Sequence, residues 1–278
     1  MARLPEICAL WIGGQLSYME QLCLQSFLDH DHKVTLYTYE GVKRVPDGIT
    51  LADAADISPF REELRHFRTG SPALMSDVFR YDLLKKRPGV IWADTDAYCL
   101  KPFQTDTGFF LGWESAHHVN GGVLGLPADS ETLNELLELC KDPYGIPPWL
   151  SERNRAIYAE AAEAGNPVHV SEMPWGIWGP HAITHFLKIT GEIEHALPTE
   201  ALYPVRYADR RVYFKRPMKT MACITKNTFS VHLYGRRVRG RLKNLSNMLP
   251  NEGSYIEYLL KLHKIDPRLA PFEIEDNK

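Results

Sequence analysis

The stretch Val90-Ile91-Trp92-Ala93-Asp94-Thr95-Asp96 decides the fold expected of this chain. An apolar run that ends in polar residues is typical of a buried strand that stops at the edge of a sheet. Side chains two positions apart in a strand point to the same side, so Asp94 and Asp96 are predicted to reach one cation. A hard divalent ion held there can bind a diphosphate. A solvated turn is the alternative, because this short pattern often arises by chance.

The chain before this stretch has the pattern of a β-α-β unit. Residues 6–12 suit a buried strand, residues 16–29 have helical periodicity, and residues 33–39 alternate between apolar and polar. Such a unit predicts an α/β fold with a mainly parallel sheet flanked by helices. Residues 41–70 are predicted to be irregular apart from a helical piece near 60–67. Further strands are predicted at 108–113, 122–126 and 228–233, further helices at 72–86, 130–141, 150–164, 179–190 and 253–264, and a surface loop at 165–178.

Composition places the chain among ordinary globular proteins. Of its 278 residues, 44% are hydrophobic and 24% are charged, and the formal net charge of −3 implies no general attraction to nucleic acid. Five cysteines without metal-binding spacing predict buried, reduced thiols. The N-terminal apolar stretch is too short for a signal peptide, and no run approaches the roughly 18 apolar residues of a membrane span. We therefore expect a cytoplasmic protein.

The predicted helix at 72–86 carries two charged residues within an apolar surround. Asp77 and Arg80 are three positions apart and therefore share one face of the helix. Charges in an apolar environment are costly unless they are paired or used in function. They are predicted either to form a structural ion pair or to line a polar pocket beside the Asp94–Asp96 strand tip.

Two segments together resemble the sugar-binding region of DXD-type glycosyltransferases. This class includes the yeast initiating mannosyltransferases, the α-1,4-galactosyltransferases and the clostridial glucosylating toxins. Its pattern is Ala-x-x-Ser-Asp-x-x-Arg, then Gly-Gly-x-Tyr-x-Asp-x-Asp. The chain matches the first half fully at residues 73–80, and in the second half it has Pro88 for a glycine and Trp92 for the tyrosine. Weaker similarities are Leu10-Trp11-Ile12-Gly13-Gly14 to the opening strand of the family and Thr228-Phe229-Ser230-Val231-His232 to a late strand that supplies a metal ligand.

The resemblance implies both an architecture and a reaction. The architecture is a GT-A-like, Rossmann-like single domain, assigned to residues 1–245, with residues 246–278 as a C-terminal helical extension packed on it. The reaction is a metal-dependent, retaining transfer of a hexose from a nucleotide sugar, with a UDP-hexose as the expected donor. The acceptor is expected to be a hydroxyl of a glycan, a lipid or a protein.

Residue roles follow from the same resemblance. Asp96 is expected to bind Mn²⁺ or Mg²⁺, which stabilises the leaving diphosphate. Asp94 is expected to divide its role between the metal and the ribose, whereas Asp77 and Arg80 hold hydroxyl groups of the donor sugar. His232 is either a third metal ligand or a hydrogen-bonded core residue.

Further candidate residues for nucleotide binding lie near the two ends of the chain. Trp11, with Ile12 and Gly13, is expected to contact the nucleotide, by stacking on the base, unless it is a core residue. The basic run 236–243 either clamps the diphosphate through Arg237 or Arg239, or is a solvated loop, or contacts anionic lipid at the inner face of the membrane.

Acceptor binding is assigned to two further places in the sequence. Asn120 and Gly121 fall where the family often has a turn that faces the acceptor. Trp175 and Trp178 form either a sugar-stacking platform or the packing of their own loop. Glu114, His117 and His118 are interpreted as acceptor-side or loop residues.

Two other functional classes share part of this pattern. A metal-dependent hydrolase of nucleotide sugars or phosphate esters would use the same carboxylates with a histidine, but it has no need of a sugar-hydroxyl clamp such as Ser76-Asp77-x-x-Arg80. A non-catalytic carbohydrate-binding protein would not need two carboxylates at a strand tip.

Overall fold

A computed structural model describes residues 4–245 and 248–272 of the chain. Its first strands are β1 (Ile7–Trp11), β2 (Val34–Thr38) and β3 (Thr50–Asp53), which are parallel to one another, with Ile7 opposite Val34 and Thr35 opposite Thr50. Helix α1 (Tyr18–Leu28) connects the first two strands. Its N-terminus is closed by a capping box in which the Ser17 side chain accepts a hydrogen bond from Met19 and the Glu20 carboxylate accepts one from the backbone of Ser17.

The central sheet has six strands in the order β3-β2-β1-β4-β7-β6. Strand β4 (Ile91–Ala93) is parallel to β1, whereas β7 (Val119–Gly125) runs antiparallel to β4, and β6 (Phe110–Trp113) antiparallel to β7. The sheet is thus mostly parallel and is flanked by helices in a single domain, which confirms the predicted α/β class.

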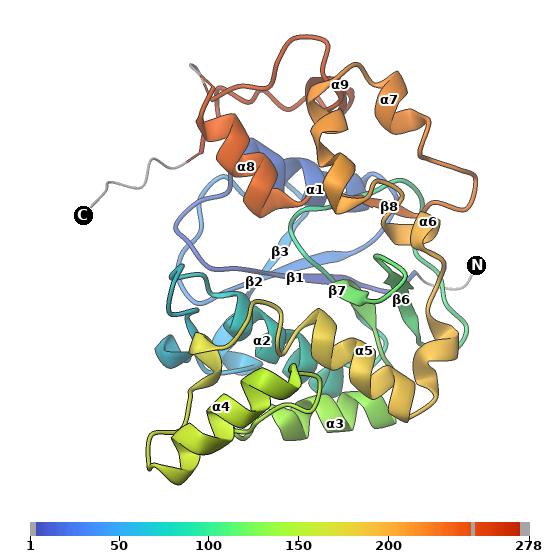
Figure 1. Ribbon diagram of the computed structural model, residues 1–278. Coiled ribbons are helices and arrows are strands. Elements are labelled where there is room, and N and C mark those ends of the chain that lie inside the picture. The colour runs from blue at the N-terminus through green and yellow to red at the C-terminus, as the bar shows by residue number, and fades with distance from the viewer. Residues whose placement is uncertain (1–3, 246–247, 273–278) are drawn as a thin grey trace.

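Helices cover both faces of the sheet (Figure 1). On one face, α2 (Ala73–Lys86), α3 (Glu131–Leu139) and α5 (Pro180–Ile189) contribute to the largest buried apolar cluster. Helix α4 (Glu152–Glu163) lies outside this layer and has no buried residue. On the other face, α1 packs with α8 (Gly235–Lys243) and α9 (Tyr255–Leu262).

A second, two-stranded sheet joins the middle of the chain to its late part. Strand β5 (Ala97–Cys99) pairs antiparallel with β8 (Ser230–His232), and Ala97 lies opposite His232. The connection between α5 and β8 contains the short helices α6 (Thr199–Leu202) and α7 (Met218–Met221) and the 3₁₀ segments Glu192–His195 and Tyr207–Phe214. The other 3₁₀ segments are Ala54–Asp56, Glu62–Leu64 and Val170–Glu172.

Several predicted elements differ from the observed ones. Residues 41–70 contain strand β3, and the helical piece expected near 60–67 is a single 3₁₀ turn. The basic run 236–243 forms helix α8 rather than a loop. In the described part of 246–278, α9 packs against α1, while the division of the chain at residue 245 stays a prediction. Within the described residues, no helix is long and apolar enough to cross a membrane.

The cysteines meet their prediction closely. All five are free thiols, and Cys8, Cys23, Cys99 and Cys140 are buried in the apolar core, whereas Cys223 is partly exposed.

Candidate functional site

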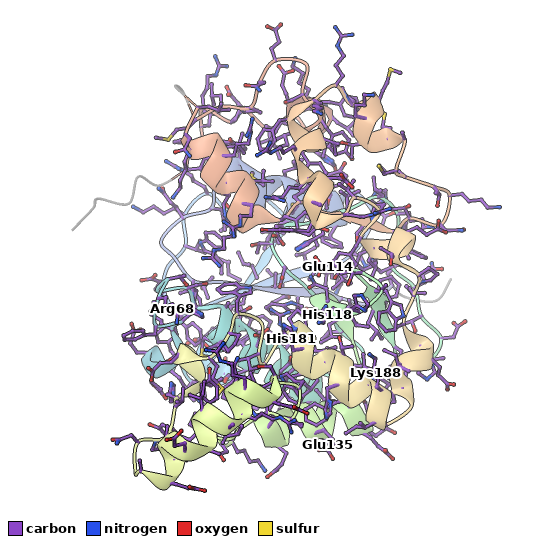
Figure 2. All side chains as sticks on the ribbon, in the orientation of Figure 1. Arg68, Glu114, His118, Glu135, His181 and Lys188 are labelled. Carbon is purple, nitrogen blue, oxygen red and sulfur yellow. The ribbon has the colours of Figure 1, made fainter. Side chains whose placement is uncertain are left out.

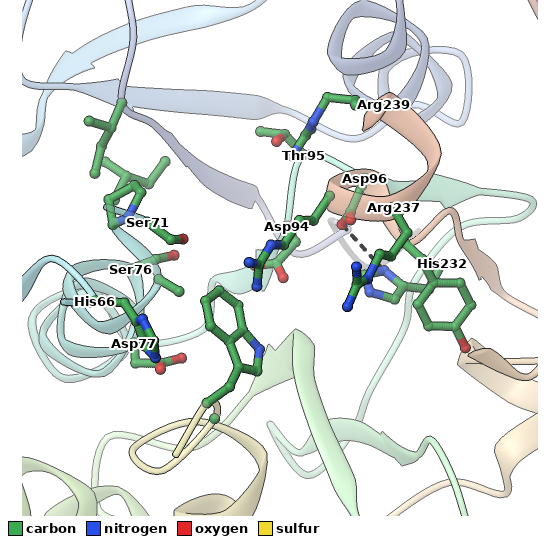
Figure 3. A pocket seen from close by; sticks show the side chains of 18 of the residues that line it. His66, Ser71, Ser76, Asp77, Asp94, Thr95, Asp96, His232, Arg237 and Arg239 are labelled. Atoms are coloured by element: carbon green, nitrogen blue, oxygen red, sulfur yellow. Dashed lines mark ion pairs between the residues drawn. The ribbon is translucent and has the colours of Figure 1, made fainter. Parts of the chain in front are cut away.

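A cavity of about 930 Å³ lies where β1 and β4 end. Its lining brings together most of the site residues predicted from the sequence, including Trp11 at the end of β1, Asp77 and Arg80 from α2, and Asp94 beyond β4. Figure 3 shows Asp77 and Ser76 on one side of this cavity and Asp96, His232, Arg237 and Arg239 on the other. Parallel strands end at the same edge of a sheet, which is where α/β proteins place their ligands.

Arg80 links two carboxylates on the α2 side of the cavity. Its Nη2 lies 3.4 Å from Asp77 Oδ1 and 3.3 Å from Asp94 Oδ1, although Arg80 is only 6% exposed. Nη1 donates a hydrogen bond of 2.5 Å to the carbonyl of Gly121, and the guanidinium lies over the ring of Trp92 at 5.0 Å. Asp77 and Arg80 thus form the predicted ion pair, and both residues also line the cavity.

Burial and charge shift the acidity of this group of residues. Burial raises the pKa of Asp77 to about 7, Arg80 lowers it in part, and Asp94 raises it further. Burial also raises the pKa of Asp94, against the opposing charge of Arg80. Desolvation of Arg80 is outweighed by its two carboxylate neighbours, so its pKa is raised and it stays charged.

Asp96 and His232 form the second charged pair of the cavity. Their side chains approach to 3.3 Å between Oδ1 and Nδ1, because Asp96 directly precedes β5 and His232 ends β8 (Figure 3). The other oxygen of Asp96, Oδ2, accepts a hydrogen bond of 2.6 Å from the backbone N–H of Gly235 at the start of α8. Burial opposes both shifts, yet mutual attraction raises the pKa of His232 to about 9 and lowers that of Asp96.

The pair Asp96–His232 fits a divalent cation. Both facing atoms, Asp96 Oδ1 and His232 Nδ1, are buried and have no hydrogen-bond partner among the described residues. Neighbouring ligands of an octahedral ion with bonds of ~2.1 Å are about 3 Å apart, close to the separation observed here. In residues 4–245 and 248–272, no three His, Cys, Asp or Glu side chains converge as a preformed metal centre. A third protein ligand stays a prediction.

Asp94 and Asp96 do not lie on one strand, contrary to the expectation from the pleat. Strand β4 ends at Ala93, and a turn follows in which the N–H of Ala97 donates to the carbonyl of Asp94. Asp94 Oδ1 is held by Trp92 Nε1 at 2.8 Å. Asp94 and His232 nevertheless lie close together in the same cavity, one on each side of Gly122. A Cβ built on Gly122 would lie 3.4 Å from both Asp94 Oδ2 and His232 Cε1.

Helix α8 supplies positive charge to the cavity. Arg236, Arg237, Arg239 and Lys243 all line it. Arg239 Nη1 donates to the buried Glu20 at 2.6 Å, and Arg237 Nε donates to the Tyr207 hydroxyl at 2.8 Å. These cations line the cavity, and both their role as a diphosphate clamp and their contact with anionic lipid stay predictions.

The opening strand also reaches the cavity. Trp11, Ile12 and Gly13 line it. Trp11 is half-buried, its Nε1 donates to the carbonyl of Gln15 at 3.1 Å, and its ring faces the Arg239 guanidinium at 6.0 Å. The indole of Trp11 is thus partly exposed at the cavity wall, and its stacking on a nucleobase stays a prediction.

The acceptor-side candidates have different outcomes. Asn120 lines the cavity, but Gly121 does not; Gly121 lies behind Arg80, and a Cβ there would come within 2.5 Å of Arg80 Nη1. Trp175 lines the cavity, is 45% exposed and faces the Arg236 guanidinium at 4.3 Å.

Trp178 is a correction to the predicted platform. It is only 1% exposed and belongs to the main apolar cluster, while its carbonyl accepts a hydrogen bond from the Tyr81 hydroxyl. Burial of the indole leaves no face for a sugar, so the prediction for Trp178 is wrong.

Several lining residues were not predicted. They include Glu20, His66, His181 and Tyr207, which line the cavity from separate elements. Glu20, three positions after Ser17, has the sequence signal of a capping box. That signal gives no indication that Glu20 also pairs with Arg239. His66, His181 and Tyr207 lie in segments whose patterns give no signal of convergence.

Comparisons with known proteins support the glycosyltransferase resemblance. No protein-family model matches the chain. In sequence, the chain is 26% identical over 179 residues to lactosylceramide 4-alpha-galactosyltransferase from Rattus norvegicus, a match that covers 60% of this chain and 42% of that protein. The chain therefore spans less than half the length of this relative.

Two solved structures are similar in part. The PaToxG glycosyltransferase has a TM-score of 0.44 and 15% identity, covering 69% of this chain and 70% of its own. A structure of a transferase mutant has a TM-score of 0.34 and 11% identity, covering 63% and 93% respectively. The sequence similarity to a galactosyltransferase agrees with the resemblance that the segments around Asp77–Arg80 and Asp94–Asp96 carry.

Proposed function

We propose that this chain is a metal-dependent glycosyltransferase that moves a hexose from a UDP-sugar to a hydroxyl acceptor. The observation that carries this proposal is a single cavity that holds two distinct charged pairs. Arg80 with Asp77 suits the hydroxyl groups of a sugar, and Asp96 with His232 suits a cation that accompanies a diphosphate.

The sugar-binding role rests on the hydrogen-bonding capacity of the α2 pair. Arg80 is anchored by the Gly121 carbonyl and by Asp94, so its orientation is set before a ligand arrives. Asp77 has an ion-pair partner at 3.4 Å and faces the cavity, so its carboxylate remains able to accept a hydrogen bond from a sugar hydroxyl. A pre-positioned donor and acceptor side by side suit a polyol.

The diphosphate role rests on the opposite wall. Asp96 and His232, with Asp94 as the proposed third ligand, would hold Mn²⁺ or Mg²⁺. When bound, such an ion stabilises the negative charge of the departing diphosphate. Arg237 and Arg239 bring further positive charge to this wall. Trp11 would stack on the nucleobase. Retention of anomeric configuration is proposed from the family resemblance.

The test is a panel of nucleotide sugars with Mn²⁺, measured by thermal shift and by release of the nucleotide. The name of the rat relative specifies a galactosyl group and lactosylceramide, so UDP-galactose and lactose come first in the panel. The parent protein should release UDP only when Mn²⁺ or Mg²⁺ is present. Asp96→Asn should lower that release by roughly 100-fold, since the divalent cation that stabilises the departing diphosphate loses an anionic ligand.

Other outcomes would redirect the assignment. Release of phosphate from simple phosphate esters, without a preference for sugar nucleotides, would favour the hydrolase instead. Binding of sugars with no turnover of any donor would favour a carbohydrate-binding protein. An Asp96→Asn variant that turns over donor at the parent rate would remove the metal assignment.

A further inference from the structure

Among the described residues, Glu114 is the acidic residue of the cavity that forms no ion pair. Five carboxylates of the described part of the chain line the cavity. Glu20 pairs with Arg239, Asp77 and Asp94 pair with Arg80, and Asp96 pairs with His232. Glu114 is the fifth, and it stays outside these pairs although the same lining contains four arginines.

The Glu114 carboxylate is held in place by a neutral partner. Its Oε2 accepts a hydrogen bond of 3.0 Å from Asn120 Nδ2, and Asn120 Oδ1 in turn accepts one of 2.7 Å from the N–H of Gly122. The backbone N–H of Glu114 donates to the carbonyl of His118 at 2.9 Å, which closes the turn between β6 and β7. Within the described residues, Oε1 makes no hydrogen bond. One oxygen is therefore fixed and the other remains available.

Asn120 links Glu114 to the proposed reacting centre. The Cβ position of Gly122 lies 3.3 Å from Asn120 Oδ1 and 3.4 Å from Asp94 Oδ2, so Asn120 connects Glu114 to the metal side of the cavity.

Two aromatic rings continue the wall beyond Glu114. His118 and His181 meet edge to face with their ring centroids 4.7 Å apart, and both line the cavity. Figure 2 shows Glu114, His118 and His181 in succession along this part of the molecule. The two rings suit the apolar face of a second sugar, and the available oxygen of Glu114 suits a hydroxyl group at its edge.

We propose that Glu114 binds the acceptor hydroxyl and takes its proton during transfer. The inference rests on the proposed function, to which it adds a catalytic residue. The acceptor oxygen forms its bond to the anomeric carbon of the donor sugar on the same face from which the diphosphate oxygen leaves, as retention requires, while the bond from that carbon to the diphosphate oxygen breaks. The acceptor proton moves to Glu114, the diphosphate leaves with the bonding electron pair, and Glu114 then returns the proton to water.

Glu114→Gln and Glu114→Ala test this role in the full chain. Water replaces the acceptor when the donor is hydrolysed, so the experiment needs no identified acceptor. Both variants should hydrolyse the UDP-sugar about 100-fold more slowly, the scale of a lost general base. Calorimetric titration of UDP with Mn²⁺ should give an affinity within about twofold of the parent, because Glu114 is not assigned to the nucleotide.

A rescue experiment separates chemistry from structure. Formate can enter the space vacated in Glu114→Ala and should raise its rate by about tenfold or more, whereas Glu114→Gln, which leaves no such space, should not respond. Glu135→Gln is the matched control, because Glu135 is exposed on α3 and lies far from the cavity (Figure 2). It should behave as the parent does.

The outcomes that overturn the proposal are distinct from failure of the function. If the parent hydrolyses a donor and Glu114→Gln does so at the same rate, Glu114 is not the base. Loss of UDP affinity, or a rate in Glu114→Ala that formate leaves unchanged, also overturns the role. If the parent releases UDP from no donor, the proposed function itself fails.

Discussion

Arg80 on helix α2 lies 3.3 Å from Asp94, the first carboxylate after strand β4, and so joins the two halves of the sequence signature. Asp94 also reaches toward His232 across Gly122, which puts it between the sugar wall and the metal wall of the cavity. A change at Arg80 therefore acts on the sugar side first, and a change at His232 acts on the metal side first.

Arg80→Lys is expected to separate sugar recognition from nucleotide binding. Lysine keeps the charge but loses the planar fork that contacts Asp94, Asp77 and the Gly121 carbonyl together. Donor hydrolysis should fall by about 10-fold or more, while calorimetric UDP affinity with Mn²⁺ stays near the parent value. A folded variant with greatly weakened UDP binding would move Arg80 to the diphosphate.

Arg80→Ala provides the complementary stability measurement. The buried carboxylate of Asp77 and the partly exposed carboxylate of Asp94 lose their cation, so the free energy of unfolding should fall by about 3–5 kcal/mol. Urea unfolding measures this loss. A much smaller loss would mean that the pair contributes little to the fold and that its presence is explained by ligand binding.

His232→Ala should raise the Mn²⁺ concentration needed for half-maximal activity, and excess Mn²⁺ should restore part of the rate. A metal-bound imidazole must be neutral, and Asp96 raises the pKa of His232 to about 9 in the absence of an ion. Acidification should thus weaken Mn²⁺ binding in the parent more than in the variant. Manganese titrations at two pH values and a melting curve on the same preparation decide the matter; lower stability with an unchanged Mn²⁺ requirement would make His232 a core residue only.

Asp77→Asn should reduce the loss of stability between about pH 4 and pH 7. Burial raises the pKa of Asp77 to about 7, above its value in the unfolded chain, so the folded protein binds more protons across this interval. Its contribution is complete below about pH 4 and is lost as pH rises toward 7, at about 1.4 kcal/mol per pH unit at most.

Melting temperatures of parent and variant across this range measure the effect. Asp106→Asn, at an exposed position, is the control and should follow the parent. Identical pH profiles for parent and Asp77→Asn would show that the Asp77 carboxyl keeps an ordinary pKa.

Gly235→Ala should weaken the metal and diphosphate wall without unfolding the protein. A Cβ there would lie 2.9 Å from both Asp96 Oδ2 and Arg239 Nη1, so α8 would have to move away from Asp96. UDP affinity in the presence of Mn²⁺ should fall by several-fold. Gly240→Ala lies in the same helix with no described atom within 4 Å of the new Cβ, and should leave binding unchanged while stabilising α8 by about 0.5–1 kcal/mol. Equal behaviour of the two variants would contradict the role of Gly235.

Local patterns were enough for the elements that carry their own signal. The apolar runs at β1 and β4 and the periodic helix with Asp77 and Arg80 are where the sequence places them. Edge features were harder, because β3 is short and mostly exposed and β5 contains only three residues. Such short strands form only because a distant partner pairs with them.

The candidate site was predictable to the same extent. Asp77, Arg80 and Asp94 lie within one helix and one strand end, so their proximity follows from adjacent elements. Trp178 could not be distinguished from Trp175, since both are tryptophans of one loop and only tertiary packing buries the first. Helix α8 begins at a left-handed Tyr234 without a side-chain cap, so no start signal marks it in the sequence.

The hydrogen bond from Gly235 to Asp96 joins residues that are 139 positions apart in the sequence. It can therefore form only late in synthesis on the ribosome. The large sheet is encoded before residue 126, and its β-α-β core can begin to fold while synthesis continues. Asp96 meets His232 and Gly235 only when most of the chain has left the exit tunnel. A nascent chain stalled before residue 230 should therefore be compact and protease-resistant in its first half, yet unable to bind UDP with Mn²⁺.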